Sequence, residues 1–515
     1  MQKLLKTCGM RGGVQSNSSL KQRIKRGFTI MELVIVIAVI AVLAAVLIPT
    51  FANVIDRANL SNDTGTVRNI NEALLADEVL NGKAETMGDA LRVAREAGYD
   101  IDKISPSADG YVYAWDDKEN QFMLLENNDG DFSVYYPEGA QISAENTWVI
   151  ADDDNYADFQ TAEYHIFRLT QSSQDVADLI SGGETDYILL GNDVDISQVL
   201  SLSSELDNIT MDLNGNTLNI EGDNQTDALV VTSDASLTIS NGNISVDGSA
   251  VEAANITVSY GGELVLDSVN LSALNSTGIY LGGDSTNAAK LTIRNSTIKA
   301  EGYVIGTNAG TPGQSVDVTI ENSVIEGDSD NVGTAFFLTI PGTINMTNVS
   351  INGYLQGVVL RGGGITANLT NCSIKNDMTV NSALAWNYFL SGHSAKQWGT
   401  GNSVPLSCLT IGNDATAPGD YNTTAPSTVT LTNCTFESIG TDDSGHEYMT
   451  VYIEGANSTA NVTLNYDSAT AASIDGTGYG LVYGANVVIN GAAMADNESD
   501  CNRIYAANLS ARSDN

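Results

Sequence analysis

The eight residues LTIRNSTI, at positions 291–298, contain the pattern that decides the fold of most of this chain. Leu291 and Ile293 alternate with polar residues, as in a strand with one buried face, and Ile298 resumes the alternation after Asn295. Asparagine is one of the few residue types that tolerate a left-handed backbone, so the pattern predicts two short strands joined by a sharp turn at Asn295.

Copies of this pattern recur along the chain. They are MDLNGNTL at 211, LTISNGNI at 237, ELVLDSVNL at 263, VTIENSVI at 318, INMTNVSI at 344, ANLTNCSI at 367 and VTLTNCTF at 429. The first seven turn positions, LTIRNSTI included, are spaced 23 to 28 residues apart. We expect the turn residues to form a structural ladder, which comprises Gly215, Asn241, Asp267, Asn295, Asn322, Asn348, Asn371 and Asn433.

A fixed period of this length indicates stacked coils. Leucine-rich repeats share the period, but they need a leucine-rich consensus, whereas these copies are β-branched with Asn, Ser, Thr and Gly between strands. We therefore expect an all-β, right-handed parallel β-helix over residues 185–515, with asparagine amides hydrogen-bonded along the stack. This solenoid resembles that of pectate lyases, whose shape polygalacturonase-like hydrolases and phage tailspikes share. Residues 139–184 are the expected linker and N-terminal cap, with an amphipathic helix at 172–183.

The other distinctive segment lies near the N-terminus. From Phe28 to Ile48 only Thr29 and Glu32 are polar, and 21 residues of helix would span about 30 Å, the thickness of a hydrocarbon core. Residues 1–27 hold seven basic side chains and no acidic one, which favours a cytoplasmic leader and an external C-terminus. A cleaved secretory signal has a shorter apolar region and no carboxylate.

The stretch KRGFTIMELVIVIAVIAVLAAVLIP, residues 25–49, resembles the N-terminus of type IV pilins and of type II secretion pseudopilins. The resemblance implies a leader at 1–27, cleavage between Gly27 and Phe28 by a prepilin peptidase, and methylation of the Phe28 amine. It also implies a membrane and filament-core helix at 28–49 and other pilin subunits as partners. A carboxylate inside the apolar slab needs a partner, and we expect Glu32 to meet the Phe28 amine of a neighbouring subunit.

Residues 50–138 are expected to form a small pilin-like α+β head. Helical spacing continues from residue 51 to Asn81-Gly82, and TMGDALRVAREAG predicts a second helix that ends at Gly98. YVYAW, QFMLLE and FSVYY predict three strands of a small antiparallel sheet. The turns DDKEN and NNDGD suggest calcium, but neither fits a dedicated calcium loop, and we interpret them as solvated hairpin turns without a cofactor.

Charge excludes one class of partner. The chain holds 23 basic and 63 acidic residues, and removal of the leader leaves 16 basic residues, for a net charge of −47. We therefore expect no nucleic-acid binding, which requires clustered Lys and Arg. The four cysteines after the leader are too sparse for a disulfide scaffold.

The disulfide state of Cys372, Cys408, Cys434 and Cys501 is left open by the sequence. Cys372 and Cys434 occupy the same position of the repeat, directly after the turn residue, and we also assign Ser268, Ser296 and Ser323 to it. The simplest interpretation of this position is a small residue buried in the stack. Their copies are 62 residues apart, and a disulfide requires adjacent rungs. The interval contains the aromatic-rich segment 385–402, with His393 and Lys396.

No catalytic residue and no metal ligand is assigned. Arg294 lacks an acidic cluster at the expected matching positions of adjacent rungs, and Asp442, Asp443 and His446 are crowded into one loop, unlike the spread acid–base groups of β-helix hydrolases. We expect a pilin-like surface protein at the cytoplasmic membrane or in a pilus, which presents a β-helix to a glycan or host surface. The alternatives are a membrane-tethered polysaccharide lyase or hydrolase, and a pseudopilin or passive spacer.

Overall fold

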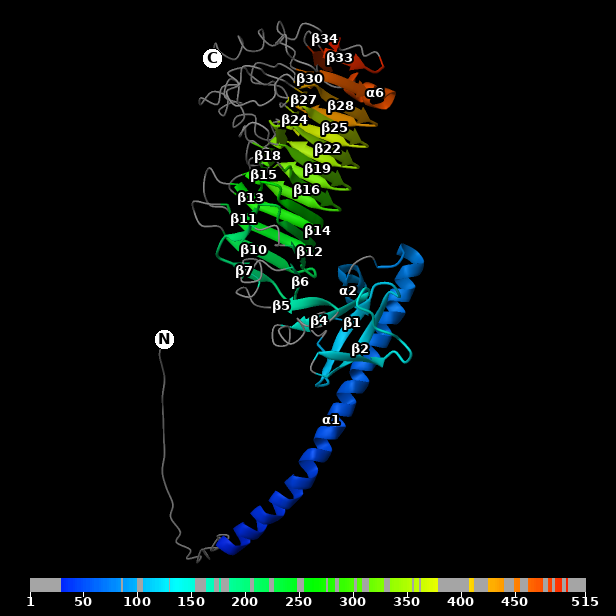
Figure 1. Cartoon of the computed structure of the whole chain (residues 1–515), viewed down its shortest axis with the longest axis vertical. Coiled ribbons are helices and arrows are strands. Elements are labelled where there is room, and N and C mark those ends of the chain that lie inside the picture. The colour runs from blue at the N-terminus through cyan, green and yellow to red at the C-terminus, as the bar shows by residue number, and fades with distance from the viewer. Residues whose placement is uncertain are drawn as a thin grey trace, which may run out of the picture. The chain divides into compact units, whose positions relative to one another are not determined.

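Figure 1 shows the computed structural model of the chain, which divides into two compact units, Met1–Ser61 and Asn62–Asn515. The expected fold class is confirmed, since N-terminal helices are followed by a large β-solenoid. The structure describes residues 29–498 except for 85–86, 100–104, 129, 153–163, 171–175, 177–184, 204–207, 222–226, 248–253, 275–276, 283–286, 301–302, 308–314, 328–333, 354–355, 361–362, 378–406, 412–424, 440–448, 454–461, 476–479, 484–486 and 493–496.

The first helix, α1 (Ile30–Asn81), is one continuous element of 52 residues. It ends where the sequence predicts, because Gly82 has a φ of +93° and its N–H donates to the carbonyl of Glu78 at 3.1 Å. The sequence predicts a membrane-spanning helix over residues 28–49. Within the described residues, the structure contains no helix that is long and apolar enough to cross a membrane.

The head packs against one side of the C-terminal part of α1. Helix α2 (Met87–Glu96) ends at Gly98, where the N–H of Tyr99 donates to the carbonyl of Ala94 at 3.0 Å. The strands β1 (Tyr111–Asp116), β2 (Gln121–Asn128) and β3 (Asp131–Tyr136) pair antiparallel in the order β1–β2–β3. Strand β4 (Thr147–Asp152) pairs antiparallel with the other edge of β1.

Two side chains of α1 hold this sheet. The buried carboxylate of Asp63 accepts the N–H groups of Ser107 and Ala108 at 3.1 and 2.9 Å. The amide of Asn71 donates to the carbonyl of Phe122 at 2.9 Å and accepts its N–H at 2.7 Å. Asn71 therefore pairs with the edge of β2 as another strand would.

The head sheet continues into the solenoid. Strand β5 (His165–Thr170) pairs parallel with β4 on one side and with β6 (Thr185–Leu190) on the other. The change from antiparallel to parallel pairing therefore occurs at β4, within residues 139–184. Of the segment 172–183, expected to form a capping helix, Val176 alone lies within the described residues, and it is buried in the solenoid core.

The coils of the solenoid form three rows of parallel strands (Figure 1). The first row continues from β6 through β9 (Asn208–Asp212), β12 (Ser236–Asp247), β14 (Glu263–Leu274), β16 (Ala289–Arg294), β19 (Val316–Glu321), β22 (Gly342–Thr347), β25 (Ile365–Thr370), β28 (Ser427–Thr432), β31 (Val462–Tyr466) and β33 (Val487–Asn490). The second row contains β7 (Val194–Ile196), β10 (Thr217–Glu221), the C-terminal halves of β12 and β14, β17 (Thr297–Ala300), β20 (Val324–Gly327), β23 (Ser350–Gly353), β26 (Ser373–Asp377) and β29 (Thr435–Ile439).

The third row forms a separate sheet. Its strands are β8 (Leu200–Leu202), β11 (Leu229–Val231), β13 (Ala254–Val258), β15 (Thr277–Leu281), β18 (Tyr303–Thr307), β21 (Thr334–Leu338), β24 (Gln356–Leu360), β27 (Ser407–Ile411), β30 (Met449–Ile453), β32 (Leu481–Tyr483) and β34 (Asn497–Glu498). The alternate residues of all three rows point inward and form one continuous apolar core. Each such Val, Leu or Ile contributes about 1.5 to 3 kcal/mol by burial.

The long interval between the last two ladder copies does not interrupt the stack. Strands β25 and β28 pair in register, as do β26 and β29, although they are 62 residues apart in sequence. The coil between them contributes β27 to the third row. The copies that carry Asn371 and Asn433 are therefore neighbours.

The second row ends beneath a helix, α6 (Ser468–Asp475). The hydroxyls of Thr470 and Ser473 accept the N–H groups of Cys434 and Phe436 at 3.0 and 2.8 Å. Side chains of α6 therefore satisfy the edge of β29, which prevents further strands from pairing there.

Candidate functional site

The start of α1 holds the residue with a predicted assembly role. The carboxylate of Glu32 accepts the N–H and the hydroxyl hydrogen of Thr29 at 2.8 and 2.9 Å, and the hydroxyl oxygen of Thr29 accepts the N–H of Glu32 at 3.2 Å. This reciprocal capping box keeps the carboxylate at the helix N-terminus. Gly27 and Phe28, the predicted processing residues, lie outside the described residues.

Several asparagines of the ladder lie at the turn between the first and second rows. The backbone is left-handed at Asn322, Asn348, Asn371 and Asn433, with φ between +50° and +56°. Their amides form a chain in which each Nδ2 donates to the Oδ1 of the preceding rung, at 2.9, 3.1 and 2.9 Å. An amide at this position therefore supports both the turn and the stacking of the next rung.

One ladder residue is placed differently. Ser268 has the left-handed φ of +57°, and Asp267 pairs in register with Ser240 and Arg294. Asp267 therefore precedes the turn and lies beside Arg294, with which it makes an ion pair at 3.1 Å. The expectation that Arg294 lacks acidic neighbours is wrong, because Glu321 also pairs with it from the next rung. In the copy that begins at residue 263, the sequence analysis assigned the turn to Asp267, one residue before the observed turn at Ser268. For the same reason Ser268 does not share the template position of Cys372 and Cys434.

The first turn of the ladder is longer than the others. It has two left-handed residues, Asn214 and Gly215, and the guanidinium of Arg95 in α2 donates to the carbonyl of Asn214 at 2.6 Å. Asp212, 2% exposed, accepts the N–H of Asn214 at 2.8 Å and the amide of Asn241 at 3.2 Å. Burial raises the pKa of Asp212 to about 6, against the opposing effect of these hydrogen bonds.

The stacked cysteines are thiols. Cys372 and Cys434 are buried thiols in adjacent rungs, and Cys408 is also a buried thiol, whereas Cys501 lies outside the described residues. The hydrogen bond to Cys372 and burial together raise the pKa of the Cys434 thiol. Both thiols also donate to backbone carbonyls, which is the behaviour of small buried residues.

An aromatic patch lies at the outer surface of the third row. Tyr260, 51% exposed, follows β13 in a left-handed conformation, and Tyr280 of β15 is half-buried beside it. Burial, with the nearby Tyr260 and Asp227, raises the pKa of Tyr280. The carboxylate of Asp227 accepts the hydroxyl hydrogen of Thr257 at 2.5 Å. An exposed ring bordered by carboxylate and hydroxyl groups has the chemistry that binds a sugar ring by stacking and hydrogen bonding.

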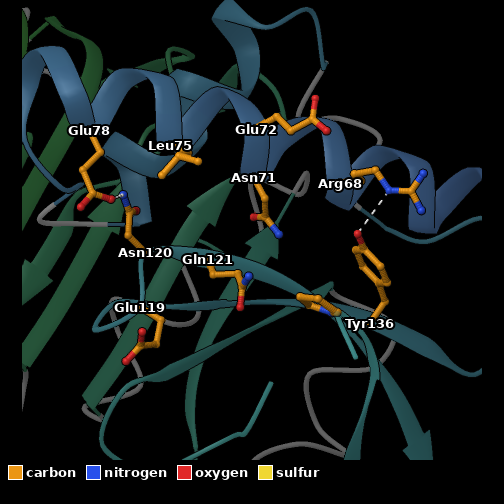
Figure 2. Close-up of a pocket in the computed structure, with 10 residues that line it drawn as sticks. Arg68, Asn71, Glu72, Leu75, Glu78, Glu119, Asn120, Gln121 and Tyr136 are labelled. Atoms are coloured by element: carbon orange, nitrogen blue, oxygen red, sulfur yellow. Dashed lines mark hydrogen bonds between the residues drawn. The ribbon is translucent and has the colours of Figure 1, made fainter. Parts of the chain in front are cut away.

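A pocket of about 300 Å³ lies in the head between α1 and the hairpin β2–β3 (Figure 2). One end contains Glu78, Glu119 and Asn120, and the amide nitrogen of Asn120 donates to Glu78 at 3.3 Å. At the other end, Nε of Arg68 donates to the hydroxyl of Tyr136 at 3.3 Å, and the guanidinium carbon lies 5.7 Å from the ring centroid. Sequence analysis missed this pocket, because its walls come from segments about fifty residues apart.

Side chains of the turns considered for calcium accept hydrogen bonds from N–H groups of the protein. Asp116 accepts the N–H of Glu119 at 2.8 Å, Asp117 accepts Nε1–H of Trp148 at 3.1 Å, and Asn127 accepts the N–H of Gly130 at 2.9 Å. Among the described residues, no group of three or more His, Cys, Asp or Glu side chains is placed to hold a metal ion.

Basic side chains of the solenoid are further residues to consider for catalysis. Lys290 and Lys375 make ion pairs with carboxylates of adjacent rungs, Glu263 at 3.6 Å and Glu437 at 3.8 Å. The charges of both lysines are therefore neutralised by carboxylates of neighbouring rungs. The other candidates lie outside the described residues: His393, Lys396, Asp442, Asp443 and His446.

Comparison with known proteins finds similarity at the N-terminus. Residues 22–48 match the family model of the prokaryotic N-terminal methylation motif. Two curated sequences of the type IV major fimbrial protein FimA of Dichelobacter nodosus are each 42% identical to this chain over 57 residues. The match covers 10% of this chain and 36% of the relative, so it spans about a third of the relatives' length.

Comparison with solved structures gives a weak likeness. The crystal structure of the Dettilon tailspike protein (gp208) is 10% identical, covers 63% of this chain and 66% of its own, and has a TM-score of 0.20. A likeness at that score supports no argument about function. The chain thus carries a prokaryotic N-terminal methylation motif with similarity to type IV fimbrial protein at its N-terminus, followed by a β-helix.

Proposed function

We propose that this chain is a pilin-like surface protein that presents its β-helix for adhesion through a glycan. The observation that carries the first part is the methylation motif at residues 22–48. In this proposal a prepilin peptidase cleaves after Gly27 and methylates the amine of Phe28. The helix from residue 28 anchors the precursor in the cytoplasmic membrane and later packs beside helices of other pilin subunits.

Glu32 has the assembly role in this proposal. Thr29, which follows Phe28 in the sequence, keeps the carboxylate of Glu32 at the helix N-terminus. A carboxylate held there attracts the ammonium of a neighbouring subunit when helices pack together.

The assembly role is tested by Glu32→Ala, with Gly27→Val as the processing control. Glu32→Ala should leave cleavage and β-helix folding intact but remove the protein from sheared filaments, as followed by immunogold labelling. Gly27→Val should leave an uncut precursor. A mature N-terminus located after residue 49 by mass analysis would contradict the pilin-like proposal.

The glycan-binding role is supported by the aromatic patch of Tyr260 and Tyr280. Tyr260→Ala should weaken binding to glycans on an array about fivefold to tenfold, the equivalent of about 1 to 1.4 kcal/mol for one stacked ring. Tyr135→Ala, which removes an exposed tyrosine of the head, is the matched control. Equal binding by both variants would exclude this patch, and release of cleaved sugar by the wild type would favour an enzyme instead.

A further inference from the structure

We propose that the pocket between α1 and the hairpin β2–β3 binds the ammonium or guanidinium group of a lysine or arginine side chain from another protein. The pocket presents three carboxylates, those of Glu72, Glu78 and Glu119. Its one cation, Arg68, already donates to Tyr136 at the opposite end (Figure 2). The end that contains Glu78 and Glu119 therefore attracts a cation and repels phosphate or carboxylate ligands.

Asn120 provides the second, independent observation. It is 6% exposed, its Nδ2 donates to Glu78, and its Oδ1 has no hydrogen-bond partner among the described residues. A buried acceptor without a donor costs about 1 to 3 kcal/mol, so the site favours a ligand that brings N–H groups. An ammonium or guanidinium satisfies Asn120 and neutralises Glu78 together, with charge-assisted hydrogen bonds.

The shape of the pocket favours an organic cation over a metal ion. Its volume of about 300 Å³ is at the small end of ligand sites, and Leu75 and Pro137 provide apolar wall for an alkyl stem. The described part of the chain offers no cluster of three or more metal-ligating side chains there. A lysine side chain has this combination of an apolar stem and a charged donor end.

The surroundings favour a protein partner that is not a second copy of this chain. Leu75 and Val79, four residues apart on the same face of α1, are 66% and 80% exposed. They continue the pocket as an apolar surface, which a partner segment with basic and apolar side chains would cover. A second copy is disfavoured because this chain carries a net charge of −40.

The test uses the full chain in a neutral detergent and isothermal titration calorimetry. The probes are a short Leu-Lys-Leu peptide with blocked ends, the same peptide with norleucine in place of lysine, and spermidine as a free polyamine. We expect the lysine peptide to bind and the norleucine peptide to bind at least tenfold more weakly. Glu78→Gln should weaken the affinity for the lysine peptide at least fivefold. Glu126 is an exposed carboxylate of β2 outside the pocket, and Glu126→Gln should change that affinity less than twofold.

Two further variants separate the parts of the proposal. Asn120→Gly removes the amide but suits the left-handed φ of +51°, so it should keep the fold and weaken the lysine peptide. Leu75→Ser should weaken the binding of the lysine peptide but not the binding of spermidine. Equal affinity for lysine and norleucine peptides would overturn the proposal. So would spermidine binding that exceeds peptide binding and ignores Leu75→Ser, since the pocket would then serve a free amine.

Discussion

The buried carboxylate of Asp212 should make the first turn of the solenoid sensitive to pH. Burial raises its pKa from the ordinary 3.8 to about 6, so the folded protein holds this proton more tightly than the opened turn does. The stability of the turn is greatest below pH 4 and falls as the pH rises through 6. The free energy lost is about 3 kcal/mol by pH 7.5, and roughly half of it is already lost at pH 5.

Asp212→Asn removes this titration. The Asn oxygen can still accept the N–H of Asn214, and the amide of Asn241 can turn its oxygen toward the new NH₂. The charges that face the site are Arg95, which lowers the pKa, and Asp89, which raises it, and both stay in place. We therefore expect the variant to stabilise the turn by roughly 1 to 2 kcal/mol more at pH 7.5 than at pH 5.

Hydrogen exchange followed by mass spectrometry measures this difference locally, which suits a stacked protein that need not unfold as one unit. The amides of Leu213 and Gly215 report the turn, because they donate to the carbonyls of Ser240 and Asn241 at 2.8 and 2.6 Å. Measurements stay at pH 5 or above, since the sequence pI is about 4.1 and low net charge promotes precipitation. Protection that falls equally at both pH values in Asp212→Asn would refute the reasoning, because the carboxylate would then be a net structural contributor.

Three further predictions concern other contacts. Asn322→Val should lower the free energy of unfolding in urea by about 1 to 3 kcal/mol, through strain at φ +50° and loss of the acceptor for Asn348. Asn322→Gly should lower it less, and equal effects of the two variants would contradict the ladder. Gly88→Ala should disturb the packing of α2, because the new Cβ would clash with Nδ2 of Asn241 and Oδ2 of Asp212, and limited proteolysis should then cut near α2; unchanged protection would contradict this packing. Asp63→Ala should destabilise the head by about 2 to 4 kcal/mol in local hydrogen exchange, because two backbone N–H groups lose their acceptor; a change under 1 kcal/mol would show that water replaces the carboxylate.

Much of the architecture follows from local signals in the sequence. The alternation around Asn295 and its recurrence predicted the parallel β-helix, because a strand's buried face and a left-handed turn depend on neighbouring residues. Gly82 and Gly98 marked the ends of two helices for the same reason. The methylation motif at residues 22–48 was recognisable from sequence because it is a short linear segment.

The tertiary structure decided what depends on pairing between distant segments. The strand register places Asp267 beside Arg294. The sequence analysis missed this neighbour because it aligned the repeat copy at 263 one residue too early, and a shift of one residue moves a side chain to the other face of a strand. Adjacent rungs brought together Cys372 and Cys434 across 62 residues. Only the folded structure shows that Oδ1 of Asn120 lacks a hydrogen-bond partner among the described residues. The reason is that the possible partners of a buried polar atom come from segments that are distant in sequence.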